Sequence, residues 1–270
     1  MLKKVTNYLT IGIFLTSFHI LSPIAEENVD CSNIKKSYER ARLFLDAKNN
    51  YSNEENGVGI LQSIVQKCKK ETPNRDNEAF ARTVYALGNA YWRGRGITKD
   101  RHKGCEYYHE VLKNSQSLPN KDKNNIENDA RLHIGDGAYW GFCEEKNWTK
   151  ALPYYFEILA NSEKTDANIL AWTKGRIADA YREGDGVEQN HVKSLALFQE
   201  IENDNKNITD KSIVAWAKYW KAHAYQHGRG VEQNTQQALA IFTDIVNTYK
   251  SQDPIAVEYA QKQIDEIRSK

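Results

Sequence analysis

The sequence predicts an all-α fold: a right-handed α-solenoid of antiparallel helix pairs that ends in a C-terminal capping helix. A motif of one helix, a glycine corner and a second helix recurs four times. Within the motif, apolar residues follow the three-to-four-residue spacing of an amphipathic helix. Only five prolines interrupt the 270 residues, so long helices are permitted. Self-similarity at a period of about 20–50 residues is typical of solenoids.

The repeated motif is clearest at its glycines. The first glycine of each corner is Gly94, Gly141, Gly184 or Gly228, at intervals of 47, 43 and 44 residues. Three copies have another glycine two residues later, whereas the second copy has Cys143 there. Glycine adopts positive φ without steric cost, so these positions are expected to end a helix and turn the chain.

Each corner is flanked by residues that favour helices. Phe80, Val84, Leu87 and Tyr91 lie on one face of the helix before the first corner. A side chain of the N-cap type stands just before each second helix; the four are Asp100, Asn147, Asn190 and Asn234. We therefore expect tight antiparallel hairpins that stack side by side. The polar stretches 114–125 and 203–211 are expected to be loops between repeats.

These residues resemble the Sel-one-like repeat, a relative of the tetratricopeptide repeat. The family pattern is a helix ending in LGxxYxxGxGV, then Asp or Asn, then KA and an apolar pair. The chain reads LGNAYWRGRGI at 87–97, IADAYREGDGV at 177–187 and AYQHGRGV at 224–231. The second copy departs from the pattern, with Ala138 in the tyrosine position. The resemblance covers residues 80–249 and implies that first helices line the concave face.

The chain divides into four predicted segments: a signal peptide at 1–25, a divergent N-terminal helical hairpin at 26–75, four Sel-one-like repeats at 76–250, and a capping helix at 251–270. The signal peptide is predicted from two lysines, an apolar stretch and small residues in that order. The apolar stretch is shorter than the about 20 residues of a membrane-spanning helix, although an uncleaved anchor is the alternative. We expect a periplasmic or secreted protein without stable membrane insertion after signal cleavage.

The four cysteines follow the predicted signal peptide at spacings of 37, 37 and 38 residues. An even number in an exported chain suggests disulfides. The start of one helix lies beside the end of the next in an antiparallel hairpin, which predicts a Cys31–Cys68 bond. Cys105, near the start of a second helix, is expected to meet Cys143 in the following corner. Four buried free thiols are the alternative.

Composition and motifs give little support to catalysis or nucleic-acid binding. Lys plus Arg is 37 and Asp plus Glu is 36, so net charge gives no reason to expect a nucleic acid or an acidic membrane as partner. No HExxH, Walker, GxSxG or SxxK motif occurs, and we expect neither an enzyme nor a cofactor. His223 and His227 could share a metal, but a third ligand at useful spacing is lacking, so no metal site is predicted.

Large or charged residues in the first helices are the remaining candidates for function. Side chains that break the repeat pattern there are predicted to bind a partner, because Trp and Arg are enriched at binding hot spots. Packing between repeats is the alternative role for the tryptophans, and solvation is the alternative for the arginines. The predicted partner-binding residues are Arg131, Trp172, Arg176, Trp216, Lys218 and His223.

These observations favour a protein–protein interaction scaffold or adaptor in the bacterial periplasm or outside the cell. The partner is expected to be another protein. Some exported members of the family act as immunity proteins, so one alternative is neutralisation of a secreted toxin such as a type VI secretion effector. Some disulfide-rich relatives are credited with binding or hydrolysing β-lactams, which gives a less favoured enzymatic alternative.

Overall fold

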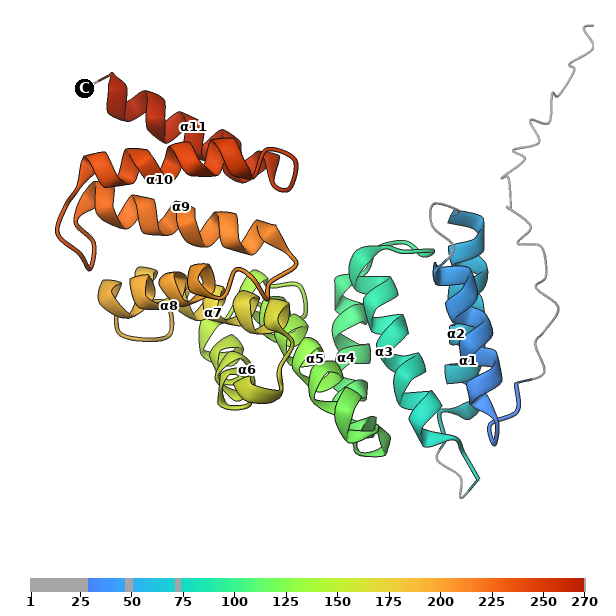
Figure 1. Cartoon of the computed structure of the whole chain (residues 1–270). Helices are drawn as coiled ribbons and strands as arrows, with labels where there is room; N and C mark the ends of the chain where they lie inside the picture. The colour runs from blue at the N-terminus through green and yellow to red at the C-terminus, as the bar shows by residue number, and fades with distance from the viewer. Residues whose placement is uncertain (1–28, 47–50, 71–73, 270) are drawn as a thin grey trace, which may run out of the picture.

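The computed structural model describes residues 29–46, 51–70 and 74–269, and within these ranges all regular structure is helical (Figure 1). The predicted signal peptide at 1–25 lies outside the described residues. Eleven α-helices and two short 3₁₀ helices occur in the described part of the chain. The α-helices are α1 (Ile34–Asp46), α2 (Tyr51–Cys68), α3 (Asn77–Arg93), α4 (Arg101–Asn114), α5 (Asn120–Trp140), α6 (Trp148–Ala160), α7 (Ala167–Glu183), α8 (His191–Asn203), α9 (Lys211–His227), α10 (Thr235–Thr248) and α11 (Pro254–Arg268).

The helices form successive antiparallel pairs, from α1 with α2 to α9 with α10, and α11 packs against α10 and α9. Each pair also contacts the next pair along the chain, so the pairs stack from the blue end of Figure 1 to the red end. The predicted all-α solenoid of five helix pairs and a final capping helix is therefore confirmed for the described residues.

Short-range chemistry sets both ends of the paired helices. Asp100, Asn147, Asn190 and Asn234 each accept a hydrogen bond from the amide three residues later, at 3.0, 3.1, 2.9 and 2.9 Å. The corner glycines end the preceding helices in the left-handed conformation, with φ of 74° at the first corner and 67° at the last. The predicted caps are confirmed because each needs only its own residue type and its neighbours.

The core runs between the paired helices. The predicted stripe of Phe80, Val84, Leu87 and Tyr91 is buried, with Val84 and Leu87 fully inaccessible. In the first pair, Gly57 stands in the middle of α2, where a Cβ would lie 2.9 Å from the carbonyl oxygen of Ala41. Glycine therefore lets α1 and α2 approach more closely than a side chain would allow.

The predicted loop at 114–125 is partly wrong, because α5 already begins at Asn120. Pro119 precedes the helix with φ of −57°, a value that suits helix entry. Asp122 in the first turn is held by Arg82 of α3 at 2.7 Å, which ties this polar turn to the preceding repeat. The polar composition thus belongs to a helical turn. The second predicted loop, 203–211, is confirmed except at its ends, since Asn203 closes α8 and Lys211 opens α9.

Successive first helices approach one another more closely than successive second helices do. Helix α1 contacts α3, α5 contacts α7, α7 contacts α9, and α9 contacts α11, whereas the described second helices make no comparable contacts with each other. Side chains join α3 to α5, where the Tyr85 hydroxyl donates to Asp129 at 2.7 Å. In a curved stack, the helices that are closest to each other lie on the inner side. We call the row of α1, α3, α5, α7, α9 and α11 the inner row.

Candidate functional site

All six predicted partner-binding residues lie on three neighbouring helices of the inner row. Helix α5 carries Arg131, α7 carries Trp172 and Arg176, and α9 carries Trp216, Lys218 and His223. Each of these side chains is partly buried, and each contacts another part of the chain. The question is therefore how much of each side chain remains for a partner.

Arg176 forms an ion pair that joins α7 to α5. Its Nε and Nη2 atoms donate to the two carboxylate oxygens of Asp136 at 2.7 and 3.2 Å, and the Tyr155 hydroxyl donates to the same carboxylate at 2.9 Å. The side chains of Arg176 and Asp136 are only 16% and 15% exposed. Burial opposes the charge of Arg176, but the adjacent carboxylate outweighs burial and raises the pKa of the guanidinium. Arg176 therefore stabilises the contact between repeats.

Arg131 and Lys218 each join a first helix to the second helix of its pair. Arg131 donates to Glu157 of α6 at 2.8 Å, and Lys218 donates to Asp244 of α10 at 2.5 Å. The carboxylates of Glu157 and Asp244 are 60% and 48% exposed, so water reaches both pairs. Arg131 and Lys218 themselves are only 20% and 17% exposed, so both cations are largely held within the fold.

The two predicted tryptophans are half-buried, and other aromatic groups beside them are open to solvent. The Trp172 indole donates to Asp210 at 3.0 Å, and the Trp216 ring lies edge-on to Tyr259 with centroids 5.6 Å apart. Tyr259 is 50% exposed, and Trp140 at the end of α5 is 48% exposed. Packing between repeats thus accounts for part of each predicted tryptophan, while Trp140 and Tyr259 present accessible rings.

His223 has a pKa below the ordinary value for histidine. Its ring lies 4.4 Å from that of His227 and 5.5 Å from that of Trp220, measured between centroids. Burial, followed by the nearby charges of His227, Arg229 and Arg182, lowers the pKa of His223 to about 4. The ring is therefore neutral near neutral pH. Among the described residues, no three His, Cys, Asp or Glu side chains gather as a group that could hold a metal ion.

Sequence reasoning missed the acidic partners of the inner row. Asp129 and Asp136 lie seven residues apart, on one face of α5, and accept hydrogen bonds from Tyr85 and Arg176. Residues seven apart in a helix lie on the same face, so this spacing could have predicted two acids on one inward face. The arginine-rich groove between α1, α3 and α5 was also missed, because its residues come from segments that no single motif contains.

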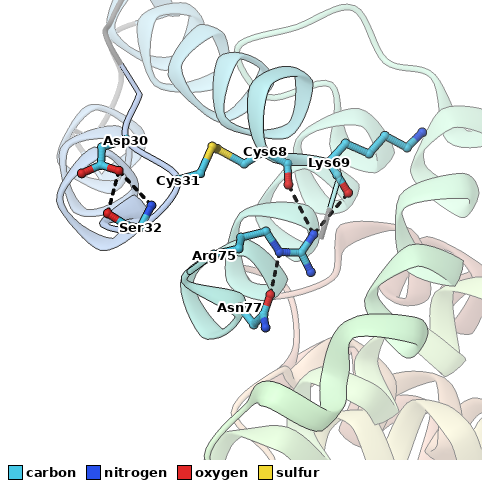
Figure 2. Close-up of a disulfide and its surroundings, with 7 residues drawn as sticks. All are labelled: Asp30, Cys31, Ser32, Cys68, Lys69, Arg75 and Asn77. Atoms are coloured by element: carbon cyan, nitrogen blue, oxygen red, sulfur yellow. Dashed lines mark hydrogen bonds between the residues drawn. A yellow bond between two sulfur atoms is a disulfide. The ribbon is translucent and has the colours of Figure 1, made fainter. Parts of the chain in front are cut away.

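The four cysteines form the two predicted pairs. Cys31 and Cys68 have Cα atoms 5.5 Å apart, and Cys105 and Cys143 have Cα atoms 5.8 Å apart. Figure 2 shows the first bond at the end of α2, where Arg75 donates to the carbonyl oxygens of Cys68 and Lys69 at 3.3 and 3.2 Å. A buried cation suits these carbonyls because the C-terminal end of a helix is partially negative. Paired cysteines indicate an oxidising, extracytoplasmic environment.

Comparison with known proteins supports the repeat assignment. The Sel1 repeat family matches residues 81–110, 175–201 and 217–243, which are the first, third and fourth copies of the motif. A search among curated proteins returned no match for this sequence. Within the described residues, none of the helices combines the length and apolar character that a membrane crossing requires.

Two solved structures are similar to this one. A Sel1 repeat protein from Oxalobacter formigenes shares 17% identity, with a TM-score of 0.53 over 92% of this chain and 91% of that chain. A structure of c5321, described as a protective antigen present in uropathogenic Escherichia coli strains displaying an SLR fold, shares 12% identity, with a TM-score of 0.41 over 88% of this chain and 56% of that chain. Proteins with Sel1 repeats generally mediate protein–protein interaction. This chain therefore contains three segments that match the Sel1 repeat, and it shares the fold of a solved Sel1 repeat protein.

Proposed function

We propose that this chain is an interaction scaffold that holds another protein along its inner row. The observation that carries the proposal is the presence of two accessible aromatic rings on this row, one on α5 and one on α11. Trp140 is 48% exposed and Tyr259 is 50% exposed. Rings of this kind contribute large contact areas and are enriched at binding hot spots.

Charged groups beside these rings would give a partner its orientation. Arg176 lies 5.7 Å from the centroid of the Trp140 ring, and Lys218 belongs to α9, the helix whose Trp216 packs against Tyr259. Aromatic anchors with charged neighbours are typical of protein interfaces. The same side chains form ion pairs within the fold, a role that suits a preorganised binding surface better than a catalytic one. Scaffolds of Sel1 repeats are typically non-enzymatic.

The proposed compartment is the periplasm or the exterior of the cell. Two disulfides support this location, because such bonds persist where the surroundings are oxidising. In these compartments, disulfides also help a binding surface to keep its shape.

The test is crosslinking in intact cells, followed by affinity purification of the chain with its partner. Trp140→Ala and Tyr259→Ala should each weaken binding of the captured partner by about 2 kcal/mol without a change in melting temperature. Val192→Ala is the matched control, because this apolar side chain is 64% exposed but belongs to the second helix α8. Arg176 is unsuitable for this purpose, since its ion pair stabilises the fold.

The outcomes of these experiments distinguish a scaffold from an immunity protein and from an enzyme. Undiminished binding by both aromatic variants would contradict the inner-row surface. A captured secreted toxin that this chain neutralises would make the scaffold an immunity protein. Hydrolysis of the β-lactam nitrocefin by the purified chain would contradict the scaffold and support an enzyme.

A further inference from the structure

The inner row contains a groove near its N-terminal end, away from the aromatic rings. Residues of α1, α3 and α5, together with the corner after α3, line a volume of about 340 Å³. That size is within the range of sites that bind small ligands or a few side chains. Four of the lining side chains are arginines and one is a carboxylate; they are Arg42, Arg82, Arg93, Arg95 and Asp46.

Two of the four arginines are held by the fold. Arg82 donates to Asp122 at 2.7 Å and to Glu78 at 3.0 Å, and its side chain is 24% exposed. Arg95 donates to Glu54 at 2.8 Å and to the carbonyl oxygen of Leu45. These contacts fix the walls of the groove, and the Arg95 side chain remains 44% exposed.

The other two arginines are available. Arg93 is exposed in the last turn of α3, and within the described residues no carboxylate lies at ion-pair distance from it. Among the described residues, Arg42 forms an ion pair with Asp46 alone, one turn away in α1, at 3.2 Å. The two side chains of that pair are 58% and 62% exposed, so the pair is weak and a ligand carboxylate could replace Asp46.

Apolar side chains form one part of the groove, and Tyr38, Tyr85 and Asn89 also line it. The apolar residues are Leu45 of α1, Ala86 of α3 and Ile126 of α5. A ligand that offers only charge would leave these groups uncovered. The combination of open guanidinium groups and an apolar wall fits a carboxylate that has an apolar neighbour.

We propose that this groove binds an acidic peptide segment of a partner protein, in which a Glu or Asp side chain adjoins an apolar residue. The proposal deepens the proposed function and rests on it, because it gives the partner a chemical class. A planar guanidinium binds a carboxylate through two parallel hydrogen bonds, which supplies both charge and direction. A nucleic acid fits less well, since Glu54, Glu78 and Asp122 flank the groove and would repel a dense polyanion.

The test uses a fluorescein-labelled short peptide of alternating glutamate and leucine, with fluorescence polarisation on the full chain. The same peptide with glutamine in place of glutamate is the control. The glutamate peptide should bind, and its affinity should fall as sodium chloride is added, because salt screens exposed charges. Arg93→Gln and Arg42→Gln should each weaken its binding about tenfold, the loss expected for one charge-assisted contact.

Arg268→Gln is the matched control, because this exposed arginine lies in the last turn of α11 at the other end of the solenoid. It should leave the affinity for the glutamate peptide unchanged, and circular dichroism should show that all variants are folded. Equal binding of the two peptides, equal affinity of Arg93→Gln and the unaltered chain, or tighter binding of a single-stranded oligonucleotide would overturn the groove proposal.

The same variants separate this proposal from the scaffold proposal. Loss of the captured partner in Trp140→Ala, with full retention in the Arg93→Gln and Arg42→Gln double variant, would leave the scaffold standing and refute the groove. Binding of the glutamate peptide without any protein captured in cells would support the groove and contradict the scaffold.

Discussion

Replacing Arg176 with methionine removes the cation that bridges α7 and α5, while a flexible apolar side chain still fills the space of the arginine stem. The variant leaves the Asp136 carboxylate, 15% exposed, without its ion-pair partner. We expect the free energy of unfolding to fall by about 3 kcal/mol. Losing one partner of a buried pair typically costs about 3–5 kcal/mol, because the remaining charge is stranded. The lower end applies here, since Asp136 keeps the hydrogen bond from the Tyr155 hydroxyl at 2.9 Å.

Denaturant titration followed by circular dichroism measures this loss. Lys35→Met is the matched control, because the Lys35–Glu39 pair spans 4.0 Å and its side chains are 73% and 61% exposed. That substitution should cost less than about 1 kcal/mol. Adding Asp136→Asn to Arg176→Met should recover part of the loss, since asparagine removes the stranded charge and still accepts from Tyr155. Equal losses in Arg176→Met and Lys35→Met would refute the reasoning.

Three further predictions concern acid stability, capping and disulfides. His223 has a folded pKa of about 4, below the ordinary 6.5, so stability should fall as the pH drops from 6.5 towards 4, and His223→Gln should flatten that part of a melting-temperature profile. Asn190→Ala should cost about 1 kcal/mol in denaturant titration, and an equal cost for the exposed Glu188→Ala would contradict a capping role. Replacing Cys105 and Cys143 together by serine should cost about 4 kcal/mol in the same titration, and an unchanged midpoint would count against the bond.

Local chemistry explains why much of the fold could be predicted from the sequence. Asn190 caps α8 through an amide only three residues away, and Gly184 ends α7 through a carbonyl four residues back. The pairing of Cys31 with Cys68 needed only the antiparallel course of one hairpin. Each of these features depends on residue type and short spacing. Because the motif is repeated, the same local signal occurs in several copies and can be recognised from the sequence.

Contacts between repeats could not be predicted in the same way. Arg176 and Asp136 are 40 residues apart, and their pairing depends on how two helix pairs are rotated against each other. A charged residue on an inward face therefore looks free for a partner until its neighbour is known, and no motif indicates that Arg176 pairs with Asp136. The groove around Arg93 was missed for the same reason, because α1, α3 and α5 meet only after stacking.

The even spacing of the four cysteines has a consequence for the order of folding events. The entropy of closing a loop depends mainly on its length, and 37 residues separate Cys31 from Cys68 just as 37 separate Cys68 from Cys105. In an unstructured chain, the incorrect middle bond therefore forms as readily as the native one. Only the helix pairs distinguish them, by bringing the native sulfurs together first. Oxidation that outpaces hairpin formation should trap the Cys68–Cys105 isomer, so correct maturation of this chain depends on rapid local folding or on a disulfide isomerase.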